Sequence, residues 1–501
     1  MNNESSKTGK NFIGVSIVIF ISKILGFFRD IVFASIFGTT VITDAFQVIF
    51  SFPSLLFSSV GTALSSVNIP DLTYYLNNRS REERNRYIAN LYAQLCLWAT
   101  LLAIVGIIFA PALSKFIAPG LEGHVAQIAT VLTHIMMPTL LFVSLTYVTA
   151  GILQVHGYFL LSATISIPFN LLIIISLLCR GEDIIFLGYV TTIGWLLQFI
   201  VQLPVLVREK YRFFFILDFK NEHTLNMFRQ LIPILLGNSL LQLCLIVDRS
   251  FGTHLEEGTA AALAFGSNLF VTVTSIFIVA MATVVFPRLS KYCLDLDFEH
   301  IRSMMSNIFK ILLFILLPYL LLVACYHQEI IALVYERGAF TSKSTSMTSL
   351  AFLFYSFAVL GYACQEIFNR VFYALKKFKV PMIVSLVCLC LNFFLNMFFF
   401  RSSGITGISI STTACLLLYA VIMGVLLKGE IGSFLGRDLL FFLLRLIPAL
   451  AAMLAVIFFF KYYYSSGLIL SFLLPLLLSA GAYLGIAYIG GIAKIVKSNN
   501  Y

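Results

Sequence analysis

Four charged side chains lie inside the first two apolar stretches of the chain, at Lys23, Arg29, Asp30 and Asp44. A charge at membrane depth is costly, so it usually faces a water-filled cavity or a partner of opposite charge. Lys23 and Arg29 are about 9 Å apart along a helix that rises about 1.5 Å per residue. Two cations at this separation fit the two ends of a diphosphate, and the two aspartates would moderate their charge. These residues predict a binding site for a phosphorylated ligand.

The same residue types also have purely structural interpretations. Arg29 and Asp30 can form an ion pair without any ligand, and Lys23 is long enough to extend its ammonium group to the membrane surface. Glu366 and Arg370 are four residues apart, which places them on one helical face and predicts an intrahelical ion pair. The binding role and the structural role of the first-stretch charges both stay open.

A second polar group lies in apolar stretches of the C-terminal half. Asp248 and Arg249 end the seventh stretch, where the pattern suits a structural ion pair and a functional site equally. Asn392 and Asn396 are four residues apart on one helical face. Their amides suit hydrogen bonds between helices, and their carbonyl oxygens suit a hard cation. Packing is the interpretation that these residues alone favour.

The composition indicates that membrane-spanning helices position these residues. Of 501 residues, 60% are hydrophobic and 11% are charged, and the mean hydropathy is +0.96. Soluble domains are about 45–50% apolar and about 25% charged, so a soluble fold and a disordered chain are both excluded. We predict an all-α polytopic membrane protein with about fourteen transmembrane helices of about 20 residues or more. The apolar runs fall at 12–38, 41–68, 89–118, 125–155, 158–179, 184–207, 224–250, 259–286, 307–333, 345–375, 380–400, 405–427, 438–463 and 467–493.

The basic residues indicate how the chain is oriented. If the N-terminus is cytoplasmic, the connections on that side carry 20 Lys and Arg residues, and the opposite connections carry six. This asymmetry follows the positive-inside rule and predicts that both termini are cytoplasmic. It also accounts for the net charge of +10, so we expect no nucleic-acid partner.

Catalytic motifs are missing from the sequence. The chain has no Walker A loop, no HExxH motif and no CxxC pair, and its nine cysteines lie mostly in apolar runs. Such cysteines are typical of packing residues rather than of disulfides or metal ligands. We expect no enzyme activity and no cofactor. Without a nucleotide-binding loop, we expect the energy for the protein's function to come from an ion gradient, the membrane potential or a substrate gradient.

The two halves of the chain show a weak internal sequence repeat. Arg29-Asp30 in the first run corresponds to Asp248-Arg249 in the seventh. Because an even number of runs separates the equivalents, the repeat is parallel, and its halves are related by an axis along the membrane normal. We predict an N-terminal lobe of six spans (1–222), a C-terminal lobe of six spans (223–430) and two additional spans (431–501). The two lobes should enclose a central cavity.

Short motifs are spread along the chain in a recognisable order. They are Ser22–Asp30 (SKILGFFRD), Ile36–Gly38 (IFG), Thr43–Phe46 (TDAF), Phe52–Leu56 (FPSLL), Val247–Arg249 (VDR), Glu336–Phe340 (ERGAF) and Arg370–Leu375 (RVFYAL). With these motifs the sequence resembles the MurJ (MviN) lipid II flippase family. That family belongs to the multidrug/oligosaccharidyl-lipid/polysaccharide exporter superfamily. The resemblance covers nearly the whole chain.

The resemblance implies a protein of the bacterial cytoplasmic (inner) membrane that acts in peptidoglycan synthesis, cell-wall biogenesis and cell shape. Such a protein moves lipid II, an undecaprenyl-pyrophosphate-linked peptidoglycan precursor, from the inner to the outer leaflet by alternating access. The implied partners are this lipid-linked oligosaccharide, membrane lipids and cell-wall synthesis enzymes, and we expect a monomer.

The resemblance also implies two sets of site residues. The substrate-binding set comprises Lys23, Arg29, Asp30, Asp44 and Asn268. The set at the place of the family's sodium site comprises Asp248, Asn392, Asn396 and Thr412. Whether sodium, protons or the membrane potential drives the cycle stays open.

Two departures from the family pattern keep alternatives open. A basic stretch of the second span is replaced by Leu55-Leu56-Phe57-Ser58, so a cavity arginine is missing at Phe57, and Asn268 stands in place of another arginine. An exporter of another polyprenyl-linked oligosaccharide, of the capsule or teichuronic type, is therefore the first alternative. A multidrug antiporter of the same superfamily would be expected to have acidic groups in its cavity. A non-transporting cell-wall scaffold would tolerate neutral replacements of Lys23 and Arg29.

Overall fold

The described part of the chain is helical throughout and contains no β-strand. The computed structural model describes residues 2–211, 216–434, 436–463 and 472–491, without the side chains of residues 2–13, 15, 16, 52–68, 70, 222, 223, 228, 275–277, 279–288, 290 and 294. The helices are α1 (Asn2–Phe37), α2 (Val41–Asn78), α3 (Arg81–Ile108), α4 (Ala110–Ile117), α5 (Gly123–Met136), α6 (Thr139–Val155), α7 (Phe159–Thr164), α8 (Ser166–Arg180), α9 (Ile184–Ile200), α10 (Leu203–Arg208), α11 (Glu222–Asn238), α12 (Leu240–Gly252), α13 (Thr259–Leu294), α14 (Phe298–Tyr335), α15 (Ser342–Phe357), α16 (Val359–Ala374), α17 (Lys379–Ile431), α18 (Arg437–Tyr463) and α19 (Leu474–Ile489). The predicted all-α fold is confirmed.

Several of these helices are long and apolar enough to cross a membrane. Within the described residues, seven helical segments meet this condition, or up to nine if each of two bent helix pairs counts as one span. They include Arg81–Ile108, Phe298–Tyr335 and Lys379–Ile431. The predicted polytopic membrane protein is therefore confirmed, and the count of about fourteen spans stays a prediction.

Helix α17 reverses its direction at Gly404. Asn392 Nδ2 donates a hydrogen bond of 2.9 Å to Thr412 Oγ1, although 20 residues of straight helix would separate them by about 30 Å. Gly404 has a non-helical backbone conformation, with φ 54° and ψ −136°. The chain therefore folds back at this glycine and forms two antiparallel arms. The two arms coincide with the separate apolar runs at 380–400 and 405–427.

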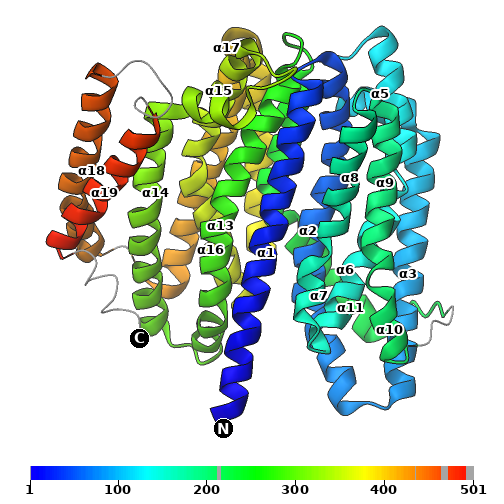
Figure 1. Cartoon of the computed structure of the whole chain (residues 1–501). Helices are drawn as coiled ribbons and strands as arrows, with labels where there is room; N and C mark the ends of the chain where they lie inside the picture. Colours follow the sequence, from blue (N-terminus) through cyan, green and yellow to red (C-terminus); the bar gives the residue numbers. More distant parts are fainter. Residues whose placement is uncertain (1, 212–215, 435, 464–471, 492–501) are drawn as a thin grey trace.

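The helices form two groups that meet around α1 and α2. Helices α3 to α10 pack mainly among themselves, α12 to α17 form a second group, and α18 and α19 lie on the outer side of α14 (Figure 1). Helix α1 contacts α7 and α8 on one side and α13 on the other, and α2 contacts α5 and α6 as well as α11, α12 and α13. The lobe boundaries at residues 222 and 430 stay a prediction.

Helices α11 and α12 follow each other across a bend of 59°. α11 ends at Asn238 and α12 begins at Leu240, and carbonyls at a helix end need hydrogen-bond donors from elsewhere. The Gly237 carbonyl accepts from Asn369 Nδ2 at 3.0 Å and from Ser385 Oγ at 3.1 Å. These contacts from α16 and α17 hold the break and set the direction of α12.

Replacing Gly404 with alanine should strain the reversal of α17. Its combination of φ and ψ suits glycine far better than any other residue, and no atom lies within 4 Å of the position of an added Cβ. We expect Gly404→Ala to lower the free energy of unfolding by about 1–3 kcal/mol, seen as a lower midpoint in thermal melts of the detergent-solubilised protein. Gly429 also has open space around an added Cβ but lies in regular helix. Gly429→Ala should keep or raise the midpoint, and equal losses in the two variants would contradict backbone strain at Gly404.

Candidate functional site

A cavity with several charged lining residues lies between the two helix groups. It has a volume of about 390 Å³, and residues of α1, α2, α8, α9, α12 and α13 line it. Its charged lining residues are Lys23, Arg29, Asp30 and Arg249, and Asn268 also lines it. The structure thus brings together four of the five residues that the sequence assigned to substrate binding, and it adds Arg249.

Arg29 combines the two roles that the sequence left open. Its Nη2 atom lies 2.7 Å from Asp30 Oδ1 in an ion pair. Its Nη1 atom donates to Asn170 Oδ1 at 3.2 Å, and its guanidinium carbon lies 5.5 Å from the centre of the Phe169 ring. These contacts from α8 hold the guanidinium at the cavity wall, so the ion pair does not remove it from the cavity.

Arg249 is a cavity cation that the sequence could not distinguish from a structural ion pair. It is 8% exposed, and its Nη1 atom donates to Ser51 Oγ at 2.6 Å. Its Nη2 atom donates to Ser267 Oγ at 3.1 Å and to Asn268 Oδ1 at 3.4 Å. Asn268, the position that lacks the family's arginine, therefore helps to orient a different arginine in the same cavity.

Asp248 points away from the cavity into a cluster of polar side chains. Its Oδ2 atom accepts from Thr412 Oγ1 at 2.6 Å and from Tyr355 OH at 2.8 Å. Its Oδ1 atom accepts from Asn396 Nδ2 at 2.6 Å and from Asn392 Nδ2 at 3.5 Å. All five side chains are fully buried. The structure thus brings together the four residues at the place of the sodium site and adds Tyr355 of α15.

This cluster is rich in oxygen atoms that suit a hard monovalent cation. It contains one carboxylate, two amide oxygens and two hydroxyl groups, and the Oδ1 atom of Asn396 is buried without a hydrogen-bond partner. Among the described residues no group of three or more His, Cys, Asp or Glu side chains could hold a metal ion. The donor set therefore fits an alkali cation better than a transition metal.

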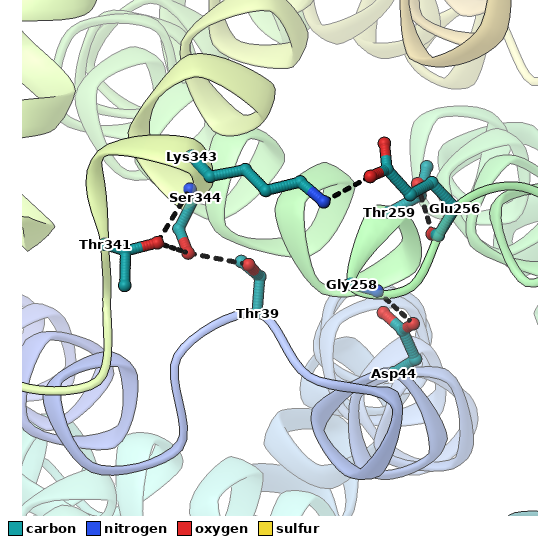
Figure 2. A network of polar contacts seen from close by, with 8 residues as sticks. All are labelled: Thr39, Asp44, Glu256, Gly258, Thr259, Thr341, Lys343 and Ser344. Carbon is teal, nitrogen blue, oxygen red and sulfur yellow. Dashed lines mark hydrogen bonds and ion pairs between the residues drawn. The ribbon is translucent and has the colours of Figure 1, made fainter.

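Asp44 lies outside the cavity, at the end of the molecule opposite the start of α1. Its Oδ2 atom accepts from the Gly258 N–H at 2.8 Å and its Oδ1 atom from the Ala261 N–H at 2.6 Å. Figure 2 shows the carboxylate of Asp44 beneath the first turn of α13. An acidic group at a helix N-terminus satisfies free N–H groups and complements the helix dipole. Asp44 of α2 therefore caps α13, which belongs to the group of helices α12 to α17.

Further contacts join the two helix groups at this end. Thr39 Oγ1 and Ser344 Oγ are 2.7 Å apart, and the Ala339 N–H donates to the Ser35 carbonyl at 2.8 Å. Gly338 has φ +60°, and a Cβ at this position would collide with the Ser35 carbonyl. Lys343 and Glu256 form an ion pair beside these contacts (Figure 2). The ERGAF motif thus supplies part of a closed seam, which here means the contacts of residues 35–44 with residues 256–261 and 338–344.

Two further predictions have different outcomes. The intrahelical ion pair of Glu366 and Arg370 is confirmed, with Oε2 and Nη2 3.6 Å apart. Phe57, where a cavity arginine was expected from the family pattern, lies outside the side chains that the structure describes.

Known proteins resemble this chain in both sequence and fold. The chain matches the family described as lipid II flippase MurJ over residues 33–479. A probable lipid II flippase MurJ from Buchnera aphidicola subsp. Acyrthosiphon pisum (strain APS) is 30% identical over 419 residues, which cover 81% of each chain. A solved structure of lipid II flippase MurJ in an inward closed conformation is 25% identical, with a TM-score of 0.80, and covers 96% of this chain and 100% of its own. A multidrug resistance MATE family transporter of the MOP superfamily shares the fold alone, with 13% identity and a TM-score of 0.64 over 84% of this chain and 98% of its own.

Removing the Asp44 carboxylate should weaken the closed seam. Asp44→Ala leaves two buried backbone N–H groups of α13 without acceptors, which costs about 1–3 kcal/mol for each group. Asp183 is a matched control, since its carboxylate also accepts from two backbone N–H groups, of Ile185 and Phe186, but does so at an exposed site on its own helix. We expect a clearly larger drop of the thermal midpoint for Asp44→Ala than for Asp183→Ala. Equal drops would show that Asp44 does not join the two helix groups.

Proposed function

The chain belongs to the lipid II flippase MurJ family, and from this premise we propose that it moves lipid II from the inner to the outer leaflet of the membrane by alternating access. The observation that carries the proposal is the set of three cations around one cavity between the helix groups, Lys23, Arg29 and Arg249. The proposal is for a transporter, without a catalytic step on its substrate.

The charge of the cavity suits a diphosphate. Three cations and the single carboxylate of Asp30 line it, which leaves a net charge of +2 opposite a group with at least two negative charges. Charge pairs in a site shielded from bulk water attract more strongly than at a surface. Neutral hydrogen-bonding groups of Gln47, Asn170 and Gln242 lie beside the cations and suit sugar hydroxyls.

The size of the cavity supports alternating access. A volume of about 390 Å³ lies near the lower end of the range for drug-sized ligands, about 300–1,000 Å³. A diphosphate-linked glycan is larger, so the two helix groups must part before it enters. With the seam around Asp44 closed, we propose that they part first at the opposite end.

The charges of the chain support one orientation in the membrane. We propose that the protein lies in the bacterial cytoplasmic (inner) membrane with the start of α1 and the C-terminus on the cytoplasmic side. The excess of basic residues in the connections at that side supports this orientation. The closed seam then faces the outside, and substrate enters from the cytoplasmic leaflet.

We also propose that the buried cluster around Asp248 binds a sodium ion. A bound cation would neutralise the carboxylate and join α12 to α15 and to both arms of α17. Asp248 and Arg249 are neighbours on α12, so a shift of this helix on cation binding would move a cation of the substrate cavity.

A second candidate substrate is another polyprenyl-linked oligosaccharide. The asparagine at position 268, where the resemblance predicts an arginine, motivates this alternative because it changes the side chains that line the cavity. The two substrates share the diphosphate and differ in the sugars. We keep the monomer and contacts with cell-wall synthesis enzymes as expectations from the family.

Removal of the cavity cations should abolish transport. We expect Lys23→Ala and Arg29→Ala to lower the rate of lipid II translocation in reconstituted vesicles by tenfold or more, because each variant removes a charge from the proposed diphosphate site. Lys115→Ala is the matched control, since Lys115 lies on α4 and is exposed. Thermal midpoints near that of the wild type would show that the variants fold. Wild-type rates in both cavity variants would reject the proposed site.

Sodium should stabilise the protein against unfolding. A ligand that binds the folded state at a hundredfold its Kd adds about 2.7 kcal/mol, so we expect a higher thermal midpoint in sodium chloride than in potassium chloride at equal ionic strength. Asp248→Asn should abolish the difference between the two salts. Asp438→Asn, on the first turn of α18, should keep it. Identical midpoints of the wild type in both salts would exclude the sodium site.

A further inference from the structure

A second basic pocket lies away from the central cavity, at the end of the molecule where α1 begins. It has a volume of about 440 Å³ and lies between the α2–α3 turn and the end of α10. Figure 1 shows the α2–α3 turn and α10 at this end. Five cations line the pocket, together with the single carboxylate of Glu209: Arg79, Arg81, Arg84, Arg208 and Lys210. None of these residues lines the cavity that contains Arg29.

The pocket is built by specific contacts between two distant segments of the chain. The Arg84 guanidinium carbon lies 4.5 Å from the centre of the Tyr211 ring, and Asn85 Nδ2 donates to the Lys210 carbonyl at 3.5 Å. Lys210 itself has φ 57°, a conformation that a residue with a side chain adopts only at some cost. The fold therefore holds these cations close together, although like charges repel.

The one carboxylate in the pocket is already bound by other groups. Glu209 Oε1 accepts from Tyr158 OH at 2.7 Å, and its Oε2 atom lies 3.4 Å from His156 Nδ1. The Nε atom of Arg84 is buried and has no hydrogen-bond partner among the described residues. Arg79 Nη1 also lies 3.4 Å from Glu83 Oε1, outside the pocket lining. Five cations beside these two engaged carboxylates leave a local excess of positive charge, which an anionic ligand would neutralise.

The depth of the pocket indicates where this anion comes from. The span from Ile184 to Arg208 has 25 residues and is about 37 Å long at 1.5 Å per residue, whereas the hydrocarbon core is about 30 Å thick. A span of this length extends beyond the hydrocarbon core, so with Ile184 at the opposite edge of the core Arg208 and Lys210 reach the level of the lipid head groups. Val207 is 72% exposed beside them, as expected for a side chain that faces lipid.

We propose that this pocket binds the phosphate head group of an anionic membrane phospholipid. The arginine guanidinium groups pair with the phosphate oxygens, and the acyl chains remain in the bilayer beside Val207. The lipid neutralises the repulsion between the α2–α3 turn and α10 and so stabilises the contact between them. This proposal does not depend on the substrate of the central cavity.

The test compares lipid binding to three forms of the full-length protein. Native mass spectrometry would count phosphatidylglycerol and phosphatidylcholine molecules retained by the wild type, by Arg81→Gln/Arg208→Gln and by Lys291→Gln/Lys379→Gln. The second pair removes two exposed cations from the C-terminal half and is the matched control. Arg84 is left intact because it packs on Tyr211.

We expect the wild type and the control to retain phosphatidylglycerol in preference to phosphatidylcholine. Each cation removed from the pocket should weaken phosphatidylglycerol binding about fivefold, so the Arg81→Gln/Arg208→Gln variant should lose most of this preference. Equal retention by that variant and the wild type would overturn the proposal, and so would an equal loss in the control. Displacement of the lipid by millimolar inorganic phosphate would show a site for free phosphate and would overturn the assignment to a lipid.

Discussion

The carboxylate of Asp248 has to be matched by hydrogen-bond donors because it is fully buried in the interior of the protein. The donors come from Tyr355 of α15, from Asn396 of the first arm of α17 and from Thr412 of its second arm. The reversal at Gly404 is what brings the two arms to the same carboxylate. Since successive residues of a helix point about 100° apart, fixing Asp248 in this cluster turns Arg249 toward the central cavity. A buried carboxylate and a cavity cation are thus tied together on one short helix, α12.

The contacts at the seam have a different requirement from those of the buried cluster. In the proposed alternating-access cycle they must be able to break. There the two helix groups are joined by hydrogen bonds such as those from Gly258 and Ala261 to Asp44, each of which contributes about 1.5–3 kcal/mol net when the acceptor is a charged carboxylate. In the proposed transport cycle, a seam of a few such bonds stays closed while the cavity is empty and opens when substrate or cation binding favours another arrangement of α12. The membrane potential acts in the same energy range, at about 2.3 kcal/mol per charge per 100 mV.

The features predicted from the sequence are those that depend on residue type and local spacing. The all-α membrane fold, the ion pair of Glu366 with Arg370 and the separate runs on either side of Gly404 follow from hydropathy and helical periodicity. The gathering of Asn392, Asn396 and Thr412 around Asp248 was expected only from the family resemblance. The position of Asp44 could not be predicted, because its partners are backbone N–H groups more than 200 residues away. Nearly every residue has such a group, so the sequence does not show which ones bind Asp44. The direction of Arg249 depends on the rotation of α12, which the hydrogen bonds of Asp248 fix and which cannot be read from the local sequence.

The most direct test of the account is to replace the only lipid II flippase of a bacterial host with this chain and to measure lipid II at the outer leaflet. If lipid II is the substrate, growth and surface lipid II are both restored, which would also show that the cavity functions with Asn268 in place of an arginine. Well-expressed protein in the membrane without surface lipid II would contradict the assignment of lipid II as the substrate.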